Sequence, residues 1–331
     1  MTKAVACRLF ALWLCCQALV VSATSGYGDN AAARALVNEL VEERGLDRDW
    51  LLQVMAQAER QEGILEAMSR PAERAKPWHE YRQIFLTEQR LVEGLAFYRA
   101  NRATFDRVEA ELGVAPEIVL SILGVETYYG RITGNYRVLD ALATLAFDYP
   151  RRSAFFSKEL KNYLILTSEQ QLDPLAMFGS YAGATGYGQF MPSSYRSYAI
   201  DFDGDGRIDI WNNPADAIGS VANYLRRHGW RSGEGVVVPA AASPQVPEEW
   251  FGLGLVPKRS VQELGAGGLR ARGAPLAPET LVTPVRLELE EGYEYWLGLH
   301  NFYVITRYNH SAMYAMSVYQ LSQQLAAGLA Q

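Results

Sequence analysis

Cysteine is nearly missing from this sequence of 331 residues. It occurs three times, and every occurrence falls within the first sixteen positions, at Cys7, Cys15 and Cys16. The rest of the chain therefore excludes a disulfide, a thiolate metal site and a cysteine nucleophile. Long apolar runs are also scarce, because no segment after residue 23 approaches the roughly 20 consecutive, predominantly apolar residues that a membrane-spanning helix needs.

The segment that carries the cysteines, residues 1–23, is typical of a secretory signal peptide. Two basic residues precede an apolar run over 9–21, and small residues follow it up to a predicted cleavage after Ala23. The pattern therefore predicts a soluble protein that is exported to the periplasm. Acylation of one of the paired cysteines would instead make a lipoprotein of the outer membrane, and this alternative stays open.

Basic residues are fewer than acidic residues in this sequence. The chain has 31 Lys and Arg residues against 37 Asp and Glu residues, a net charge of −6, which becomes −8 when Lys3 and Arg8 leave with the signal peptide. Nucleic-acid binding calls for a basic patch, so we expect no nucleic-acid partner. With 49% hydrophobic and 21% charged residues, the composition is that of an ordinary soluble globular protein of two or three domains.

The periodicity of apolar residues predicts a mainly α fold of the α+β class. Apolar residues recur every three or four positions up to about residue 111, which is typical of helices. Between 231 and 299 proline and glycine rise, and "GVVVPAA", "TLVTPVRLEL" and "YEYWLGL" are typical of short strands. We therefore expect a helical domain over 24–100, a core over 101–231, a small β-rich domain over 232–299 and a C-terminal segment over 300–331 that returns to the core.

The stretch "DFDGDGRIDIWNNPAD", residues 201–216, has the spacing of an EF-hand-type loop. Positions 1, 3, 5 and 6 of such a loop are occupied by Asp201, Asp203, Asp205 and Gly206. The carbonyl of Arg207 would take position 7. Position 12 is Asn212 and not the usual Glu, so Asp216 would supply the last carboxylate of a longer loop. The pattern predicts a structural Ca²⁺ site, and the alternative is a solvated acidic turn.

A single carboxylate stands at the end of an apolar helix predicted in "PEIVLSILGVETYYGRITG". Pro116 is suited to the first helical turn, and Gly130 is expected to end the helix. One face carries Ile118, Val119, Ile122 and Leu123, and Glu126 is the next residue on it. A buried carboxyl group tends to stay protonated, and such a group is a general acid. Two alternatives stay open: Glu126 reaches solvent at a frayed end, or pairs with Arg131.

The stretch "GSYAGATGYGQFMPSSY", residues 179–195, is rich in glycine and alanine. Small residues allow a close approach of backbone to backbone or to a ligand. Ser180 adds a hydroxyl group, and Gln189 adds an uncharged amide at the end of the glycine run. A binding loop and a tight interior packing loop both fit this composition.

Four blocks together resemble a known family. "GVETYYGR", "AGATGYGQFMPSSY", "DAIGSVANYL" and "ITRYNHSAMYAM" are similar, in this order, to the membrane-bound lytic murein transglycosylase B family, glycoside hydrolase family 103. The similarity extends from about Trp78 to Leu321. It implies a lysozyme-like core with a helical N-terminal domain, a small β insertion and an EF-hand-like calcium loop. It also implies cleavage of the β-1,4 bond between N-acetylmuramic acid and N-acetylglucosamine in peptidoglycan, which leaves a 1,6-anhydromuramyl end.

The resemblance also implies a role for each matching residue. Glu126 would be the single acid and base, without a second carboxylate as nucleophile, supported by Ser180 and Gln189. The residues implied to line the glycan cleft are Tyr81, Met191, Tyr224, Tyr308, Asn309 and Tyr314, with Arg151 and Arg152 near the stem peptide. The implied calcium ligands are Asp201, Asp203, Asp205, the Arg207 carbonyl and Asp216.

The expected partners are peptidoglycan glycan strands with their stem peptides, and enzymes of cell-wall synthesis; the protein itself is expected to be a monomer. Two other functions stay open. One is a non-catalytic peptidoglycan-binding scaffold on the same fold. The other is a lysozyme-type hydrolase, which would need a second carboxylate roughly 5–9.5 Å from the first. Asp140, Asp148 and Glu159 are near enough in sequence to be candidates.

Overall fold

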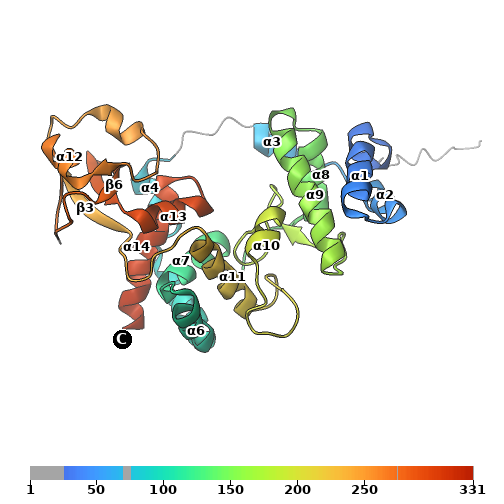
Figure 1. Cartoon of the computed structure of the whole chain (residues 1–331), viewed down its shortest axis with the longest axis horizontal. Helices are drawn as coiled ribbons and strands as arrows, with labels where there is room; N and C mark the ends of the chain where they lie inside the picture. Colours follow the sequence, from blue (N-terminus) through green and yellow to red (C-terminus); the bar gives the residue numbers. More distant parts are fainter. Residues whose placement is uncertain (1–25, 70–75, 274, 331) are drawn as a thin grey trace, which may run out of the picture.

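The computed structural model describes residues 26–69, 76–273 and 275–330, so the predicted signal peptide lies outside the described residues. The chain is mainly helical with a small sheet, which confirms the predicted fold class. Figure 1 shows β3 and β6, which belong to the larger sheet, at one end of the molecule and the first two helices at the other. Within the described part, no helix combines the length and the apolar character that crossing a membrane requires.

One hydrophobic cluster joins the first helices to a later helical hairpin. Its helices are α1 (Ala31–Arg44), α2 (Arg48–Ala56), α3 (Glu62–Ser69), α8 (Val138–Phe147) and α9 (Ser153–Glu169). Local chemistry sets the ends of α1. The Asn30 side chain caps it by accepting hydrogen bonds from the backbone N–H groups of Ala32 and Ala33, and Gly45 ends it with a φ of 64°.

A second cluster forms the centre of the molecule around α7. Its helices are α4 (Trp78–Tyr81), α5 (Glu88–Ala100), α6 (Arg102–Leu112), α7 (Pro116–Thr127), α10 (Pro192–Tyr198), α11 (Pro214–Arg227), α13 (His300–Tyr308) and α14 (Ala312–Leu329). Helix α7 packs against α5, α6, α11 and α14. Every residue of α7 is buried apart from Glu117 and Glu126, so the helix is enclosed on all sides and not on one face alone.

Helix α7 does not end where the sequence predicted. It ends at Thr127, three residues before Gly130, and two tyrosines follow in the left-handed region, Tyr128 with a φ of 55° and Tyr129 with a φ of 59°. The N–H of Tyr129 bonds the carbonyl of Leu123 at 3.1 Å, which closes the last turn. The prediction was wrong because glycine is the usual residue for this conformation.

Packing around its ring holds Tyr129 in this strained conformation. Its hydroxyl donates to the carbonyl of Arg90 at 3.0 Å. Two glycines make room for it, because a Cβ at Gly94 or Gly124 would come within 2.3 or 2.7 Å of the hydroxyl oxygen. Tyr129 therefore fixes the end of α7 against α5, and with it the position of Glu126.

The strands form an antiparallel five-stranded sheet in the order β4-β6-β7-β3-β5. They are β3 (Val237–Ala242), β4 (Arg259–Ser260), β5 (Leu269–Ala271), β6 (Leu281–Glu288) and β7 (Tyr293–Gly298), and α12 (Val261–Ala266) packs beside β4 and β5. The long hairpin of β6 and β7 pairs Thr283 with Gly298 and Glu288 with Tyr293. A separate two-stranded pair, β1 (Tyr136–Arg137) with β2 (Phe178–Gly179), lies beside the glycine-rich stretch.

Candidate active site

Glu126 lies half-buried in the last turn of α7. Its Oε1 accepts a hydrogen bond of 2.6 Å from the hydroxyl of Tyr314 in α14, which is 188 residues away in the chain. Helices α7 and α14 pack closely along each other, so this contact follows from the packing of the central cluster. In the described part of the chain, Tyr314 is the only hydrogen-bond partner of the Glu126 side chain.

The surroundings of Glu126 change its acidity. Burial raises its pKa from 4.5 to about 7, while the hydrogen bond from Tyr314 acts in the opposite direction. No neighbouring carboxylate among the described residues contributes to the rise. Glu126 is therefore close to half-protonated near pH 7, which suits a group that must first donate and then accept a proton.

Two more tyrosines lie close enough to Glu126 to feel its charge. Burial first, and then the charge of Glu126, raise the pKa values of Tyr81 and Tyr308. The Tyr308 hydroxyl donates to the carbonyl of Gly188 at 2.5 Å, which joins α13 to the glycine-rich stretch. These phenols remain neutral near pH 7 and present hydrogen-bonding groups beside the carboxyl group.

The other predicted cleft residues lie on the elements around these tyrosines. Tyr224 of α11 packs on Tyr308 with ring centroids 4.7 Å apart, and its hydroxyl donates to the carbonyl of Arg307 at 2.6 Å. Met191 lies directly before α10 and packs partly buried against the first cluster. Asn309 directly follows α13 and is exposed.

Arg151 and Arg152 occupy an exposed 3₁₀ turn, Pro150–Arg152, before α9. The guanidinium of Arg152 lies 4.3 Å from the centroid of the Phe155 ring. Among the described contacts, none joins either arginine to Glu126. Both therefore remain available to a ligand at the surface.

The structure locks Ser180 and Gln189 into the glycine-rich stretch. The Ser180 Oγ accepts a hydrogen bond of 3.1 Å from the N–H of Ala184, which leaves its own hydrogen free to donate. The Gln189 Nε2 donates to the carbonyls of Thr133 and Gly186 at 3.0 and 3.2 Å, and Gln189 itself has a φ of 50°. None of the described hydrogen bonds links either side chain to Glu126.

The three candidate second carboxylates are engaged elsewhere. Asp140 forms an ion pair with Arg137 at 2.7 Å. Asp148 accepts a hydrogen bond from the Tyr27 hydroxyl. Glu159 is buried and accepts hydrogen bonds from the N–H and the hydroxyl of Ser193 at 2.9 and 2.7 Å. Each carboxylate joins helices of the first cluster to neighbouring segments, and this is a structural role.

The acidic loop brings three carboxylates together at the surface. One oxygen each from Asp201, Asp203 and Asp205 lies within 4.8 Å of the others. Gly206, which follows them, makes the sharp turn with a φ of 89°. A hydrogen bond of 2.8 Å from the Asn213 side chain is the main cause of a lowered pKa at Asp203. Ionised carboxylates at this spacing fit a hard divalent cation.

Asp216 lies apart from this group, buried in the first turn of α11. Its Oδ1 accepts from the N–H of Phe202 and its Oδ2 from the N–H of Asp209, both at 2.7 Å. Its carboxylate therefore holds the two arms of the acidic loop together. The carbonyl of Arg207 belongs to the same loop, and its side chain is exposed.

Thr127 is a residue that the sequence pattern did not single out. Its Oγ1 accepts from the N–H of Gly130 at 2.9 Å and donates to the carbonyl of Tyr187 at 2.8 Å. It therefore ties the end of α7, next to Glu126, to the glycine-rich stretch. A Thr directly after the candidate acid was the available signal, but its partner lies 60 residues away.

Comparisons with known proteins show the family of the chain. The family described as "Transglycosylase SLT domain" matches residues 28–323. The chain is 44% identical over 310 residues to the membrane-bound lytic murein transglycosylase B of Escherichia coli strain K12, covering 91% of this chain and 84% of that protein.

Two solved structures are similar throughout. The soluble lytic transglycosylase SltB1 of Pseudomonas aeruginosa has 49% identity and a TM-score of 0.86, with 91% of this chain and 100% of that chain covered. The Escherichia coli lytic transglycosylase Slt35, solved in complex with calcium, has 43% identity and a TM-score of 0.85, with 93% and 97% covered. The chain therefore belongs to the transglycosylase SLT domain family, as a lytic transglycosylase that acts on peptidoglycan.

Proposed function

We propose that Glu126 is the single acid and base of this lytic transglycosylase. The bond that it cleaves is the β-1,4 bond between N-acetylmuramic acid and N-acetylglucosamine, and the product carries a 1,6-anhydromuramyl end. The observation that carries the proposal is a carboxyl group whose pKa burial raises to about 7, with one phenol as its hydrogen-bond donor. Such a group is available as an acid near neutral pH and is also a competent base.

The reaction then needs no water. Protonated Glu126 donates its proton to the glycosidic oxygen, and the bond from that oxygen to C1 of the muramyl residue breaks. The Glu126 carboxylate next takes the proton of the C6 hydroxyl while O6 bonds to C1. The Tyr314 hydroxyl stabilises the intervening carboxylate, because its hydrogen bond lowers the pKa of Glu126.

The surroundings of Glu126 support a mechanism without a second carboxylate. Asp140, Asp148 and Glu159 are bound to Arg137, Tyr27 and Ser193. A lysozyme-type hydrolase would place a carboxylate near the acid, and its charge would raise the pKa of Glu126 further. The rise at Glu126 has burial as its only cause.

The proposed site residues keep the roles that the resemblance implies. The free hydroxyl hydrogen of Ser180 and the amide of Gln189 would orient the acid and the sugar. Tyr81, Met191, Tyr224, Tyr308, Asn309 and Tyr314 would line the glycan cleft. The exposed pair Arg151 and Arg152 would bind carboxylates of the stem peptide. The proposed domains are 24–100, 101–231 with the acidic loop, 232–299, and 300–331.

We also propose that the acidic loop holds a structural Ca²⁺. The ligands would be Asp201, Asp203 and Asp205, with the Arg207 carbonyl and Asp216. The close grouping of the first three carboxylates supports this. The ion would neutralise their mutual repulsion and fix the loop before α11.

For its location, we propose export by the signal peptide into the cell envelope. The relative in Escherichia coli is named as membrane-bound, and a lipid anchor at a cysteine of the signal peptide remains the alternative to a soluble periplasmic protein. The proposed partners are glycan strands with stem peptides and enzymes of wall synthesis.

Mass spectrometry of digested peptidoglycan tests the mechanism. The wild type should release muropeptides with anhydro ends, one water lighter than hydrated ends. Glu126→Gln should fold and lose activity by roughly 10²–10⁴-fold, the usual contribution of general acid–base catalysis. Glu117→Gln, at the other end of α7, is the matched control and should retain activity. Hydrated ends would overturn the transglycosylase mechanism, and an active Glu126→Gln would overturn the role of Glu126.

A further inference from the structure

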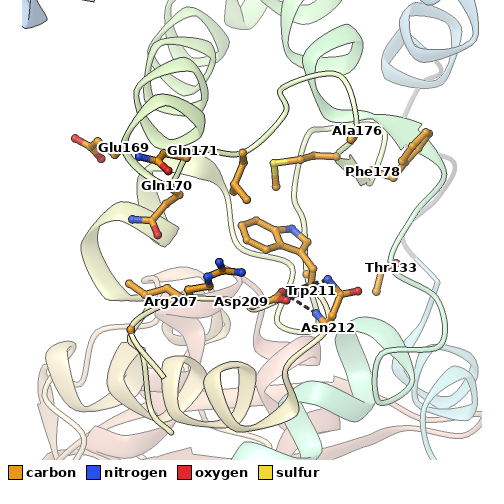
Figure 2. A pocket seen from close by; sticks show the side chains of 15 residues that line it. Thr133, Glu169, Gln170, Gln171, Ala176, Phe178, Arg207, Asp209, Trp211 and Asn212 are labelled. Carbon is orange, nitrogen blue, oxygen red and sulfur yellow. Dashed lines mark hydrogen bonds between the residues drawn. The ribbon is translucent and has the colours of Figure 1, made fainter. Parts of the chain in front are cut away.

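A cavity forms between the segment that follows α9 and the acidic loop, and Glu126 does not line it. It encloses about 700 Å³, a volume within the range of small-ligand sites. Its walls come from residues 169–178 after α9, from residues 206–212 of the acidic loop, and from Thr133 and Gly186 (Figure 2). None of the catalytic or cleft residues proposed above lines it.

Aromatic and apolar side chains form the centre of this cavity. Trp211 projects into it below the loop that carries Ala176 and Phe178 (Figure 2). The indole is held in place, because one face stacks on Tyr195 with centroids 5.3 Å apart and its Nε1 donates to Thr185 Oγ1 at 2.6 Å. Phe178 stands at the edge with 52% of its surface exposed. Flat apolar rings of this kind pack against the C–H face of a sugar.

Amide groups surround the aromatic centre. Gln170 and Gln171 project from the end of α9, and their side chains take part in none of the hydrogen bonds among the described residues. Gln171 has a φ of 52° because it ends α9: its N–H bonds the carbonyl of Ser168, and the N–H of Leu172 bonds the carbonyl of Thr167 at 2.9 Å. Amides beside an aromatic ring suit the hydroxyl and acetamide groups of an N-acetylated sugar.

The rim carries one cation, Arg207, and two carboxylates, Glu169 and Asp209. Glu169 is already paired with Arg196 at 2.9 Å, and Asp209 accepts the backbone N–H groups of Trp211 and Asn212. The guanidinium of Arg207 lines the cavity and has no ion pair within the described residues. The planar guanidinium of Arg207 is therefore available to pair with a carboxylate of a ligand.

We propose that this cavity is a second, non-catalytic site that binds an N-acetylated amino sugar carrying a carboxylate. This is the chemistry of a peptidoglycan strand, and the identity of the ligand rests on the proposed function. The site adjoins the catalytic machinery, because the Gln189 amide donates to the carbonyls of two of its lining residues, Thr133 and Gly186. Its role is to hold a second point of a long or cross-linked substrate while Glu126 acts on the first.

Binding is tested by NMR on the full exported chain carrying Glu126→Gln. The probe is GlcNAc-MurNAc with a dipeptide, and the reporter is the Trp211 indole signal, assigned by its loss in Trp211→Phe. The signal should shift and saturate with the probe, and chitotriose, which lacks a carboxylate, should bind several-fold more weakly. Arg207→Ala should abolish that difference. A Trp211 signal that is unmoved by about 10 mM probe would overturn the proposal.

A kinetic comparison tests the role of the site. Phe178→Ala with Gln170→Ala should raise KM several-fold on intact sacculi and much less on a short soluble glycan. Tyr293→Ala, an exposed aromatic residue of β7, is the matched control and should change neither value. An equal rise in KM on both substrates would overturn the proposal that the cavity binds a second part of a long substrate. If the wild type released no anhydro ends, the proposed mechanism would fail while the Trp211 titration would still report the second site.

Discussion

Glu126 and the acidic loop use the same functional group in opposite surroundings. Glu126 is alone, lies half-buried in the last turn of a tightly packed helix and receives one hydrogen bond, from a neutral phenol. Asp201, at the surface, accepts three backbone N–H groups at 2.7 to 3.2 Å and has two carboxylates within 4.8 Å. Burial raises the pKa of Glu126, whereas a hydrogen bond from Asn213 lowers that of Asp203.

The comparison shows that environment and not residue type decides between proton transfer and cation binding. Desolvation penalises a charge, so an isolated buried carboxyl group retains its proton near neutral pH. Donated N–H groups and contact with water stabilise the charge, so clustered carboxylates in an exposed loop stay ionised and fit a hard cation. Three measurements test this contrast.

The largest expected effect is on the pH dependence of stability. The folded-state pKa of Glu126 is raised from 4.5 to about 7. The contribution of the protonated Glu126 to the free energy of unfolding is therefore fully present below pH 4.5. About 3 kcal/mol of this free energy is lost as the pH rises from 4.5 through 7. Glu126→Gln cannot ionise, so it should be more stable than the wild type by about 3 kcal/mol at pH 8 and nearly equal at pH 4. Denaturant unfolding at the two pH values measures this, and a difference independent of pH would contradict it.

A smaller effect is expected from the one phenol that stabilises the Glu126 carboxylate. Tyr314→Phe removes that hydrogen bond, so the pKa of Glu126 should rise further. A hydrogen bond to a charged group contributes about 1.5–3 kcal/mol, so the alkaline limb of kcat/KM should move up by about one to two pH units. Tyr319→Phe on the same helix is the control and should leave the profile in place. If the alkaline limb of Tyr314→Phe stayed in place, Tyr314 would have no effect on the pKa of Glu126, and the prediction would be contradicted.

The smallest expected effect belongs to the acidic loop. At ten times its dissociation constant, Ca²⁺ should stabilise the folded protein by about 1.4 kcal/mol, which corresponds to a rise of about 2–4 °C in Tm. Asp201→Asn should remove most of this rise, and Asp106→Asn, an exposed aspartate of α6, should not. Thermal unfolding with calcium and with a chelator measures both. If calcium did not change the Tm of the wild type, the proposed ion would be ruled out.

Structural features that depend only on residues close together in the sequence were predictable. Pro116 begins α7, and the alternating aspartates with Gly206 form a tight acidic loop. The end of α7 was not predictable, because Tyr128 and Tyr129 adopt a conformation that their own sequence disfavours. The packing of Tyr129 between Gly94 and Gly124 makes that conformation stable.

The order of residues along the chain was enough to predict one carboxylate at the end of an apolar helix and three others grouped in a loop. Both depend on spacing within a few residues, and helical and turn geometry follow from such spacing. The packing of distant segments, in contrast, makes Tyr314 donate to Glu126 and forms the cavity whose lining residue Thr133 accepts from the Gln189 amide. These features join segments far apart in the chain, and the acidity of Glu126 depends on how completely the packed helices exclude water from it.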